Sequence, residues 1–542
     1  MPPVWVGPHT RPEHYALRRG ELRTPTGVVD LSTVPKERGP GHLSGIHGHT
    51  LPFPSREMPW KGPVRPDSRS ANQARAARLV VTSPRNGRRG LFAVGVAFSV
   101  LSPAAGAALR QPASPPGTPS PQVTFDFVWN RIRDTYYDTG MRGLNWDAVR
   151  AEFRPRAVAA ENPSELRRVL SEMLGRLGES HFTIIPGSVA GLLGVDPVGP
   201  PQGNANPGLA IRWLDGEVVV TRVRKGSPAA VAGIQPGWIL ESIAGLPVDS
   251  LVQRIREAVP DHTEEREFAL WLPGAVERRL LGPEGTPVRL GFRDGSSALI
   301  VFDVDRAPPA GEEVRFGNLP PLHVNAEFRE EILTGGQRVG VVRWSAWFLA
   351  IVPAVAAAVD ELRDAHGIVL DLRGNPGGLG ALAMRIGGHF LDQPVSLGTM
   401  RTRDTELQFV VNPQRVAPDG RRVEPYAGPV AILVDPLTAS TSEFFAAGLQ
   451  ALGRARVFGE PTAGQALPAV VVELPNADRM MHVVADFTAP DGSRLEGSGV
   501  QPDVPRAPSR ESLLAGRDVA LAAALDWLDS LPGASAPVSG SR

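Results

Sequence analysis

A serine between a predicted strand and a predicted helix is the best-placed nucleophile of this 542-residue chain. Ser440 follows the apolar run Val430 to Val434, which predicts a buried strand, and precedes Phe444 to Leu452, which predicts a helix. Such a turn exposes the hydroxyl and directs the first amides of the helix towards an oxyanion. Ser440 is therefore expected to attack a carbonyl group, whereas Ser442 is expected only to cap the helix.

A glycine-rich loop follows a second predicted buried strand, Gly367 to Leu372. Gly377 and Gly378 lack side chains and would let backbone amides approach a substrate atom closely. A phosphate-binding loop is the rival interpretation. It fails because neither Gly-Lys-Ser/Thr nor the dinucleotide-binding glycine pattern follows.

A serine nucleophile needs a base, and the composition narrows the choice. The chain has no cysteine, which excludes thiol nucleophiles, disulfides and thiolate metal sites. No lysine follows Lys225. The histidines beyond residue 107 are His181, His262, His323, His366, His389 and His482. His181 directly follows Ser180 after a helix that ends at Gly178, but taken alone it is more typical of a structural or surface histidine.

The elements that must position these residues change along the chain. Helical periodicity over Phe125 to Tyr137, Trp146 to Phe153 and Ser164 to Leu177 predicts a small helical domain. Past Glu313 the pattern alternates strands with helices, which is typical of α/β order.

The segment from Pro207 onwards resembles a PDZ domain, with Gly208, Leu209, Ala210 and Ile211 as its carboxylate loop. Consecutive amides there would form an anion nest, and an extended peptide would add as a strand to the sheet edge beside it. Asp249 to Val259 is expected to line the groove, with Glu264 to Leu281 as a helical insertion. A β-rich spacer that binds nothing is the alternative.

The first hundred residues are expected to lie outside the folded part. Residues 1–84 are rich in Pro, Gly and Arg and predict a disordered or mis-annotated extension, with translation starting near Val80 or Val81. Their His42, His47 and His49 are interpreted as a solvated tail rather than a metal site. Residues 85–107 combine arginines, a short apolar run and an Ala-x-Ala site, which predicts a signal peptide cleaved after Ala107.

From about Phe125 to Asp529 the chain resembles the tail-specific (C-terminal processing) protease superfamily. The matching motifs are Leu370 to Gly378, Thr438 to Glu443 and Gly459 to Gly464. The resemblance implies an α/β multidomain fold with an α/β catalytic domain of the ClpP/crotonase-like type. The expected boundaries are a Pro/Ser linker at 108–122, a helical domain at 123–204, a PDZ-like domain at 205–306, a catalytic domain at 307–530 and a flexible tail at 531–542.

The resemblance also assigns the catalytic roles. The better-known branch uses a lysine where this chain has Gln465, so a Ser/Lys dyad within the catalytic domain is impossible. The tricorn-type branch instead implies Ser440 as nucleophile, His181 as base and acid, and Glu496 with Ser180 orienting the imidazole. Amides of Gly377 or Gly378 and of Thr441 would form the oxyanion hole. Burial lowers the pKa of an imidazole and a carboxylate partner raises it, so His181 is expected to have a pKa near ~6.5.

The expected function is therefore an exported serine endopeptidase, periplasmic or extracellular, that takes polypeptides by their C-termini and needs no cofactor or metal. The formal net charge is zero, and no Lys/Arg stripe indicates nucleic acid. Once the signal peptide is removed, no stable membrane insertion is expected. A catalytically silent relative that binds peptides or hydrophobic ligands is the alternative, and a hydrolase of small esters is another. The sequence leaves the oligomeric state open.

Overall fold

The computed structural model describes residues 120–186, 203–258, 265–315 and 321–532, together with two short strands near the N-terminus. Those strands, β1 (Glu21–Thr24) and β2 (Gly27–Asp30), pair antiparallel, although the sequence predicted no element there. The predicted signal peptide and most of the linker lie outside the described residues. Helix α1 begins at Pro121 and so includes the last two residues predicted as linker.

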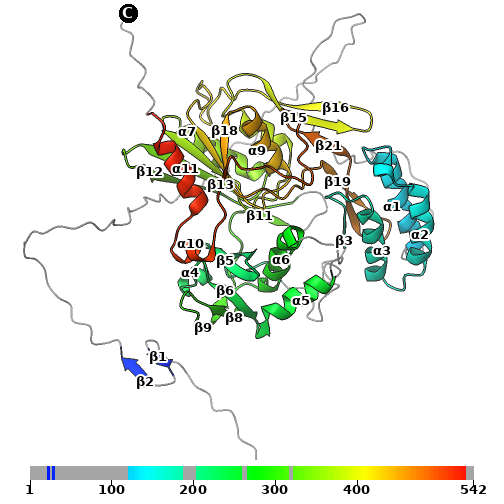
Figure 1. Ribbon diagram of the computed structural model, residues 1–542, viewed down its shortest axis with the longest axis horizontal. Helices are drawn as coiled ribbons and strands as arrows, with labels where there is room; N and C mark the ends of the chain where they lie inside the picture. The colour runs from blue at the N-terminus through cyan, green and yellow to red at the C-terminus, as the bar shows by residue number, and fades with distance from the viewer. Residues whose placement is uncertain are drawn as a thin grey trace, which may run out of the picture. The chain divides into compact units, whose positions relative to one another are not determined.

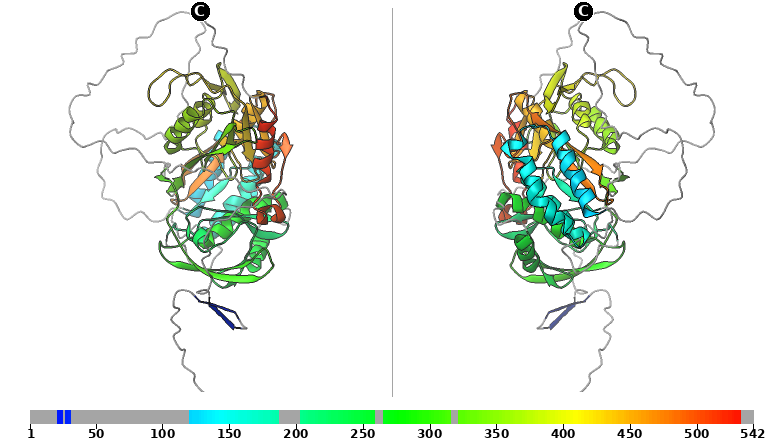
Figure 2. Two further views of the ribbon diagram at one scale, coloured as in Figure 1. Left: turned by 90° about the vertical axis from the view of Figure 1, so that its left-hand side faces the viewer. Right: turned by 90° about the vertical axis from the view of Figure 1, so that its right-hand side faces the viewer.

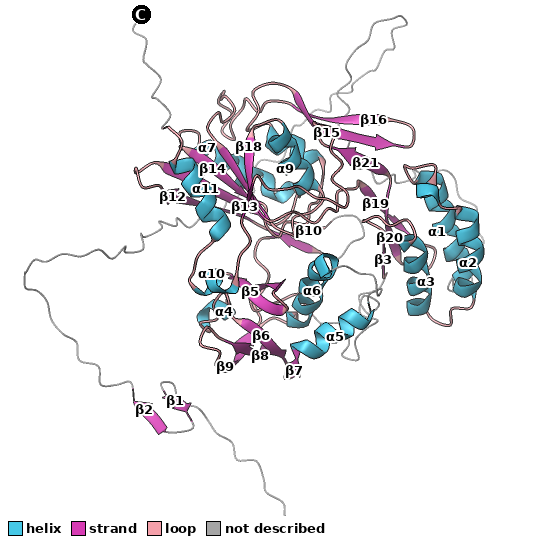
Figure 3. Ribbon diagram, in the orientation of Figure 1, coloured by secondary structure: helices cyan, strands magenta, loops and turns pink. Residues whose placement is uncertain are grey.

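A six-stranded sheet forms the centre of the C-terminal part (Figure 3). Its strand order is β12 (Ala326–Ile332), β13 (Arg338–Trp344), β14 (Gly367–Asp371), β17 (Val430–Val434), β18 (Ala455–Gly459) and β22 (Val504–Pro505). Only the β12–β13 pair is antiparallel. Every residue of β14 and β17 is buried, as expected for central strands that are covered on both faces.

Helices cover both faces of this sheet (Figure 1). Ile368 and Leu370 of β14 join the core beneath α7 (Val352–Glu361), α8 (Ala381–Gly387) and α9 (Thr441–Ala451). Val369 points the opposite way, into the core beneath α11 (Val519–Asp529). A further sheet, β16 (Glu406–Val411), β15 (Val395–Thr402) and β21 (Ala485–Thr488), packs against α9 through β15.

The N-terminal helices α1 (Pro121–Thr135), α2 (Trp146–Val158) and α3 (Pro163–Gly175) lie side by side (Figure 2). The face of α1 that the periodicity predicted is buried, and Phe125 and Val128 are fully covered. Distant parts of the chain complete this core, because Leu467 and Met480 pack into it. Met480 belongs to the sheet β19 (Ala469–Glu473), β20 (Arg479–Val483), β3 (Thr183–Ile185). The helices are therefore joined to the segment that follows Gln465.

The middle part contains an antiparallel sheet in the order β4 (Leu209–Leu214), β5 (Glu217–Val223), β6 (Ile239–Ile243), β8 (Pro287–Arg293) and β9 (Leu299–Asp305). Helix α6 (Glu265–Leu280) packs against the edge strand β4, whereas α5 (Val248–Ala258) packs against β6. The expectation that the earlier helix lines the edge strand was wrong. The segment taken for an insertion has that place, since Phe268, Leu272 and Val276 are buried in the core of this part.

The described chain thus has a mixed α/β fold with several sheets, as the alternation of strands and helices predicted. Among its described residues, no helix combines the length and apolar character needed to cross a bilayer.

Candidate active site

Ser440 lies on a tight turn between β17 and α9. Its φ of 56° and ψ of −119° are outside the regions that residues with side chains ordinarily adopt, so neighbouring contacts must hold the turn. The Ser440 N–H is shared between the carbonyl of Gln465 and Oε2 of Glu443, each at 2.9 Å. The Ala439 N–H donates to the carbonyl of Asn375 at 3.1 Å. The turn is thereby fastened to two other loops.

One of those loops carries the two glycines expected in the oxyanion hole. The Gly377 N–H donates to Oδ1 of the buried Asn375 at 3.0 Å, and the Gly377 carbonyl accepts from the Trp347 N–H at 2.9 Å. Within the described part of the chain, the amides of Gly378 and Thr441 have no hydrogen-bond partner. Of the two glycine amides, that of Gly378 is therefore the one available to a substrate.

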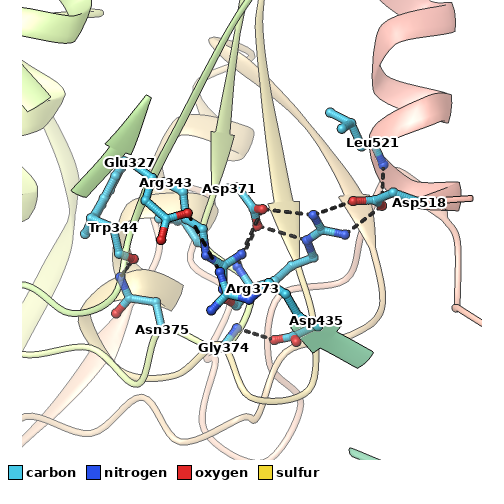
Figure 4. Close-up of polar contacts among 12 residues, drawn as sticks. Glu327, Arg343, Trp344, Asp371, Arg373, Gly374, Asn375, Asp435, Asp518 and Leu521 are labelled. Atoms are coloured by element: carbon cyan, nitrogen blue, oxygen red, sulfur yellow. Dashed lines mark hydrogen bonds and ion pairs between the residues drawn. The ribbon is translucent and has the colours of Figure 1, made fainter. Parts of the chain in front are cut away.

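An ion network fixes the base of this glycine loop (Figure 4). The Arg373 guanidinium lies between Asp371 at the end of β14, 2.8 Å from Nη2, and Asp518 at the N-terminus of α11, 2.7 Å from Nη1. Arg343 of β13 also donates to Asp371 at 2.8 Å. Burial alone would raise the pKa of Asp371, but the two guanidinium groups hold it well below its ordinary value. The start of the glycine loop is thus held in place by charged side chains at the end of β14 and the N-terminus of α11.

Ser180, His181 and Glu496 form a hydrogen-bonded cluster, although Glu496 lies more than 300 residues further along the chain than the other two. The Ser180 N–H donates to Oε1 of Glu496 at 2.7 Å, and Ser180 Oγ lies 3.0 Å from Oε2. Ser180 Oγ is also 2.7 Å from Nδ1 of His181. An ionised carboxylate only accepts, so the Ser180 hydroxyl donates to Glu496 and accepts from Nδ1–H of His181. The lone pair of the imidazole is then on Nε2, the nitrogen a base would use.

Burial controls the ionisation of this cluster. It lowers the pKa of His181 to about 4, which differs from the expected value near ~6.5. Burial also raises the pKa of Glu496. The carboxylate partner does not offset the effect of burial on His181, and the imidazole is neutral at pH 7.

The His181 cluster is linked to Ser440 through the chain after Thr462. Oε2 of Glu496 accepts from the Ala466 N–H at 2.9 Å, and the preceding residue, Gln465, accepts from the Ser440 N–H. Within the described residues no hydrogen bond joins His181 directly to Ser440 Oγ. The loop of Glu496 and the turn of Ser440 are therefore linked through the backbone of Gln465 and Ala466.

Glu443 is a central residue of the site to which the sequence analysis gave no role. Its side chain is fully buried and accepts from the Ser440 N–H, the Gly464 N–H at 2.8 Å, the Gln465 N–H at 3.1 Å and Thr462 Oγ1 at 2.5 Å. Burial raises its pKa to about 7. Its place three residues after Ser440, at position N3 of α9, is the signal that could have identified it.

The other described histidines are held elsewhere. His366 bonds to the carbonyl of Leu528 at 2.8 Å, and Nε2 of His482 accepts from Arg131 at 3.2 Å. His389 is buried after α8, and His323 lies in β11 (Leu322–Val324), which pairs antiparallel with β10 (Glu312–Val314). His262 is outside the described residues.

The predicted peptide-binding residues lie at the start of β4. Gly208 has a φ of 89° and its N–H donates to Oδ1 of Asn206 at 2.9 Å, while Leu209, Ala210 and Ile211 begin the edge strand. Arg212 of the same strand makes a two-pronged ion pair with Glu460, at 2.5 and 3.1 Å. Because Glu460 begins the segment that leads to Gln465, the edge strand is tied to the loop that contacts Ser440.

Comparison with known proteins identifies two domains. Residues 338–506 match peptidase family S41, and residues 119–175 match the tricorn protease C1 domain. The chain is 27% identical over 411 residues to a carboxyl-terminal-processing protease of Synechocystis, covering 74% of this chain and 85% of the relative. It is 26% identical over 409 residues to the chloroplastic carboxyl-terminal-processing peptidase 2 of Arabidopsis thaliana, covering 72% and 70%.

Solved structures of CPAF share the fold. The crystal structure of mature CPAF aligns with a TM-score of 0.51 at 14% identity, covering 76% of this chain and 96% of that one. The photosystem II D1 C-terminal processing protease aligns with a TM-score of 0.48 at 21% identity, covering 74% and 99%. The family matches and the named relatives agree with the motifs on which the sequence resemblance rested. The chain is a serine-type peptidase with a peptidase family S41 domain at residues 338–506 and a tricorn protease C1 domain at residues 119–175.

Proposed function

We propose that the protein is an exported serine endopeptidase that cleaves polypeptides through an acyl-enzyme and recognises their C-termini with a PDZ-like domain. The observation that carries this proposal is the turn of Ser440, strained at φ 56° and set against Gly377, beside the cluster of His181, Ser180 and Glu496. These groups are what acyl transfer needs: a nucleophile, a base with a free nitrogen, and amides without partners.

In the proposed reaction, Nε2 of His181 removes the Ser440 proton as Oγ attacks the scissile carbonyl. The amides of Gly378 and Thr441 donate to the oxyanion of the tetrahedral intermediate. As the intermediate collapses, His181 returns the proton to the leaving amine. A water molecule activated by the same nitrogen then hydrolyses the ester on Ser440. Glu496 acts through the Ser180 hydroxyl and stabilises the transient imidazolium.

This mechanism requires the His181 imidazole to reach Ser440 when substrate binds. Catalytic hydrogen bonds commonly shorten only in the substrate complex. His181 itself has a left-handed backbone, with φ at 62°, and among the described residues its ring is hydrogen-bonded only at Nδ1.

The middle part of the chain would act as the PDZ-like module. Its edge strand β4 starts at the glycine loop and has α6 beside it, an arrangement in which a peptide can add as a further strand. The Arg212–Glu460 ion pair supports the delivery of a bound chain end towards Ser440. The catalytic part would then correspond to the ClpP/crotonase-like type.

Export rests on residues 85–107, which lie outside the described part of the chain. Protein recovered from the periplasm or the medium should begin at or near Ala108. N-terminal mass spectrometry would measure this directly, and recovery of full-length cytoplasmic protein alone would contradict export.

The test of the proposed function is cleavage of one polypeptide in two forms, with a free or an amidated C-terminus. We expect faster cleavage of the free form, with the difference appearing in KM, because the anion nest binds a carboxylate. Ser440→Ala should abolish cleavage of both forms. Ser498→Ala is the matched control, since the exposed Ser498 hydroxyl donates only to backbone carbonyls near Glu496. Cleavage by Ser440→Ala would overturn the proposal, and equal cleavage of the two forms would remove its C-terminal recognition.

A further inference from the structure

Glu179, the residue before Ser180, has a carboxylate that the mechanism above does not use. Its side chain is 1% exposed and lies among four donors. It accepts from the hydroxyls of Tyr136 at 2.5 Å and Tyr137 at 2.8 Å, and from the guanidinium groups of Arg142 at 2.7 Å and Arg494 at 2.6 Å. A buried carboxylate with this many partners fixes the loop that carries it.

The partners of Glu179 come from the two segments that the active site must bring together. Tyr136 and Tyr137 directly follow α1, so they belong to the N-terminal helical part. Arg494 lies two residues before Glu496, just as Glu179 lies two residues before His181. The Glu179–Arg494 contact and the Ser180–Glu496 contact are thus successive cross-links between the same two loops.

The two cross-links lie beside His181, whose backbone has an unfavourable conformation. His181 has φ at 62°, a left-handed conformation that residues with a side chain rarely adopt. The phenols stay protonated donors, because burial and Glu179 raise the pKa of Tyr137 to about 12. Arg494 is in turn held by Asp486 at 3.0 Å. The contacts of Glu179 with Tyr136, Tyr137, Arg142 and Arg494, here called the clamp, therefore do not depend on one ion pair.

We infer that Glu179 is a positioning residue that sets His181 against Glu496 and makes the end of α1 a working part of the catalytic centre. The inference rests on the proposed function, because it assigns Glu179 an effect only through His181. Loss of the clamp should therefore lower kcat and leave KM within about twofold, since substrate contacts are unchanged.

The experiment measures kcat, KM and the melting temperature of Glu179→Gln and Tyr137→Phe. In Glu179→Gln an amide nitrogen would face a donor, and we expect kcat to fall about 10- to 100-fold, the range of a hydrogen bond to a charged group. Tyr137→Phe removes a single hydroxyl and should fold, with kcat about tenfold lower. Asp126→Asn is the matched control: Asp126 of α1 also binds two guanidinium groups, those of Arg150 and Arg154, but it has no contact with the His181 loop among the described residues.

A double-mutant cycle separates positioning from general destabilisation. The rate of fluorophosphonate labelling of Ser440 would be compared in the wild-type and His181→Ala backgrounds. If Glu179 acts through His181, Glu179→Gln lowers the rate in the first background and changes it less than about twofold in the second. Equal losses of labelling rate in both backgrounds would overturn the inference. It would also be overturned if Glu179→Gln and Tyr137→Phe both had the kcat of Asp126→Asn.

Failure of the underlying proposal has a different signature. If His181→Ala labels as fast as the wild type, the base assignment is wrong whatever Glu179 does. If His181→Ala is slow but the Glu179 and Tyr137 variants are not, only the positioning role of Glu179 falls.

Discussion

Gly377 lies directly against Ser440: a β-carbon on Gly377 would be 2.7 Å from Cβ of Ser440 and 3.0 Å from the amide nitrogen of Thr441. Real β-carbons do not approach other atoms this closely. The φ of Gly377, 96°, is also one that side chains disfavour. The position can hold only glycine without displacing Ser440 or the amide of Thr441.

Gly377→Ala should therefore lower kcat by at least about 10²-fold, the effect of losing an oxyanion donor. Gly374→Ala is the matched control, because Gly374 also has a positive φ, 71°, but its added β-carbon would meet nothing nearer than 3.7 Å. Steady-state kinetics and melting temperatures of both variants separate backbone strain from the collision. Comparable losses of kcat in the two would contradict the role given to Gly377.

The pH dependence should reveal the burial of His181. The base must be neutral to accept a proton, so kcat/KM should rise with pH through the pKa of His181, at about 4 instead of the ordinary ~6.5. The enzyme should therefore keep its kcat/KM at pH 5.5, where an exposed imidazole would be mostly protonated. A pH profile of kcat/KM, with circular dichroism at each pH to follow the fold, makes this measurement. A midpoint near 6.5 would show that His181 is solvated in the free enzyme or is not the base.

Glu443 should couple stability to pH. Its folded pKa of about 7 lies above the unfolded value of 4.5, so the folded state binds the proton more tightly and stability falls as pH rises from 4.5 to 7. Denaturant unfolding at pH 5 and pH 8 should show this loss in the wild type and not in Glu443→Gln.

Glu443→Gln should also lower kcat. It should lower the free energy of unfolding by about 1–3 kcal/mol, because an amide nitrogen would face one of the four donors. Glu473→Gln, at the exposed end of β19, is the control. An identical pH dependence of stability in wild type and Glu443→Gln would remove the case for this buried proton.

The sequence predicted those parts of the site that are carried by local patterns. The buried strands Gly367 to Leu372 and Val430 to Val434 were visible as apolar runs, and the turn of Ser440 and the loop of Gly377 follow them directly. The alternation of strands and helices likewise predicted the α/β order. These features depend on neighbours in the chain, which is why one sequence suffices for them.

What could not be predicted depends on long-range packing. The pKa of His181 is set by the atoms buried around it, and the clamp of Glu179 joins residues more than 300 positions apart. The choice between α5 and α6 beside β4 failed for a related reason. Both segments have helical periodicity, and only the tertiary fold decides which one covers the edge strand.

The central claim is that Ser440 is the nucleophile and His181 its base, and covalent labelling tests it most directly. A fluorophosphonate should form one adduct, mapped by mass spectrometry to the peptide that contains Ser440. His181→Ala should slow its formation by at least about 10³-fold, because residues of one catalytic unit depend on each other. An adduct on another residue, labelling that survives in Ser440→Ala, or full-rate labelling of His181→Ala would contradict the claim.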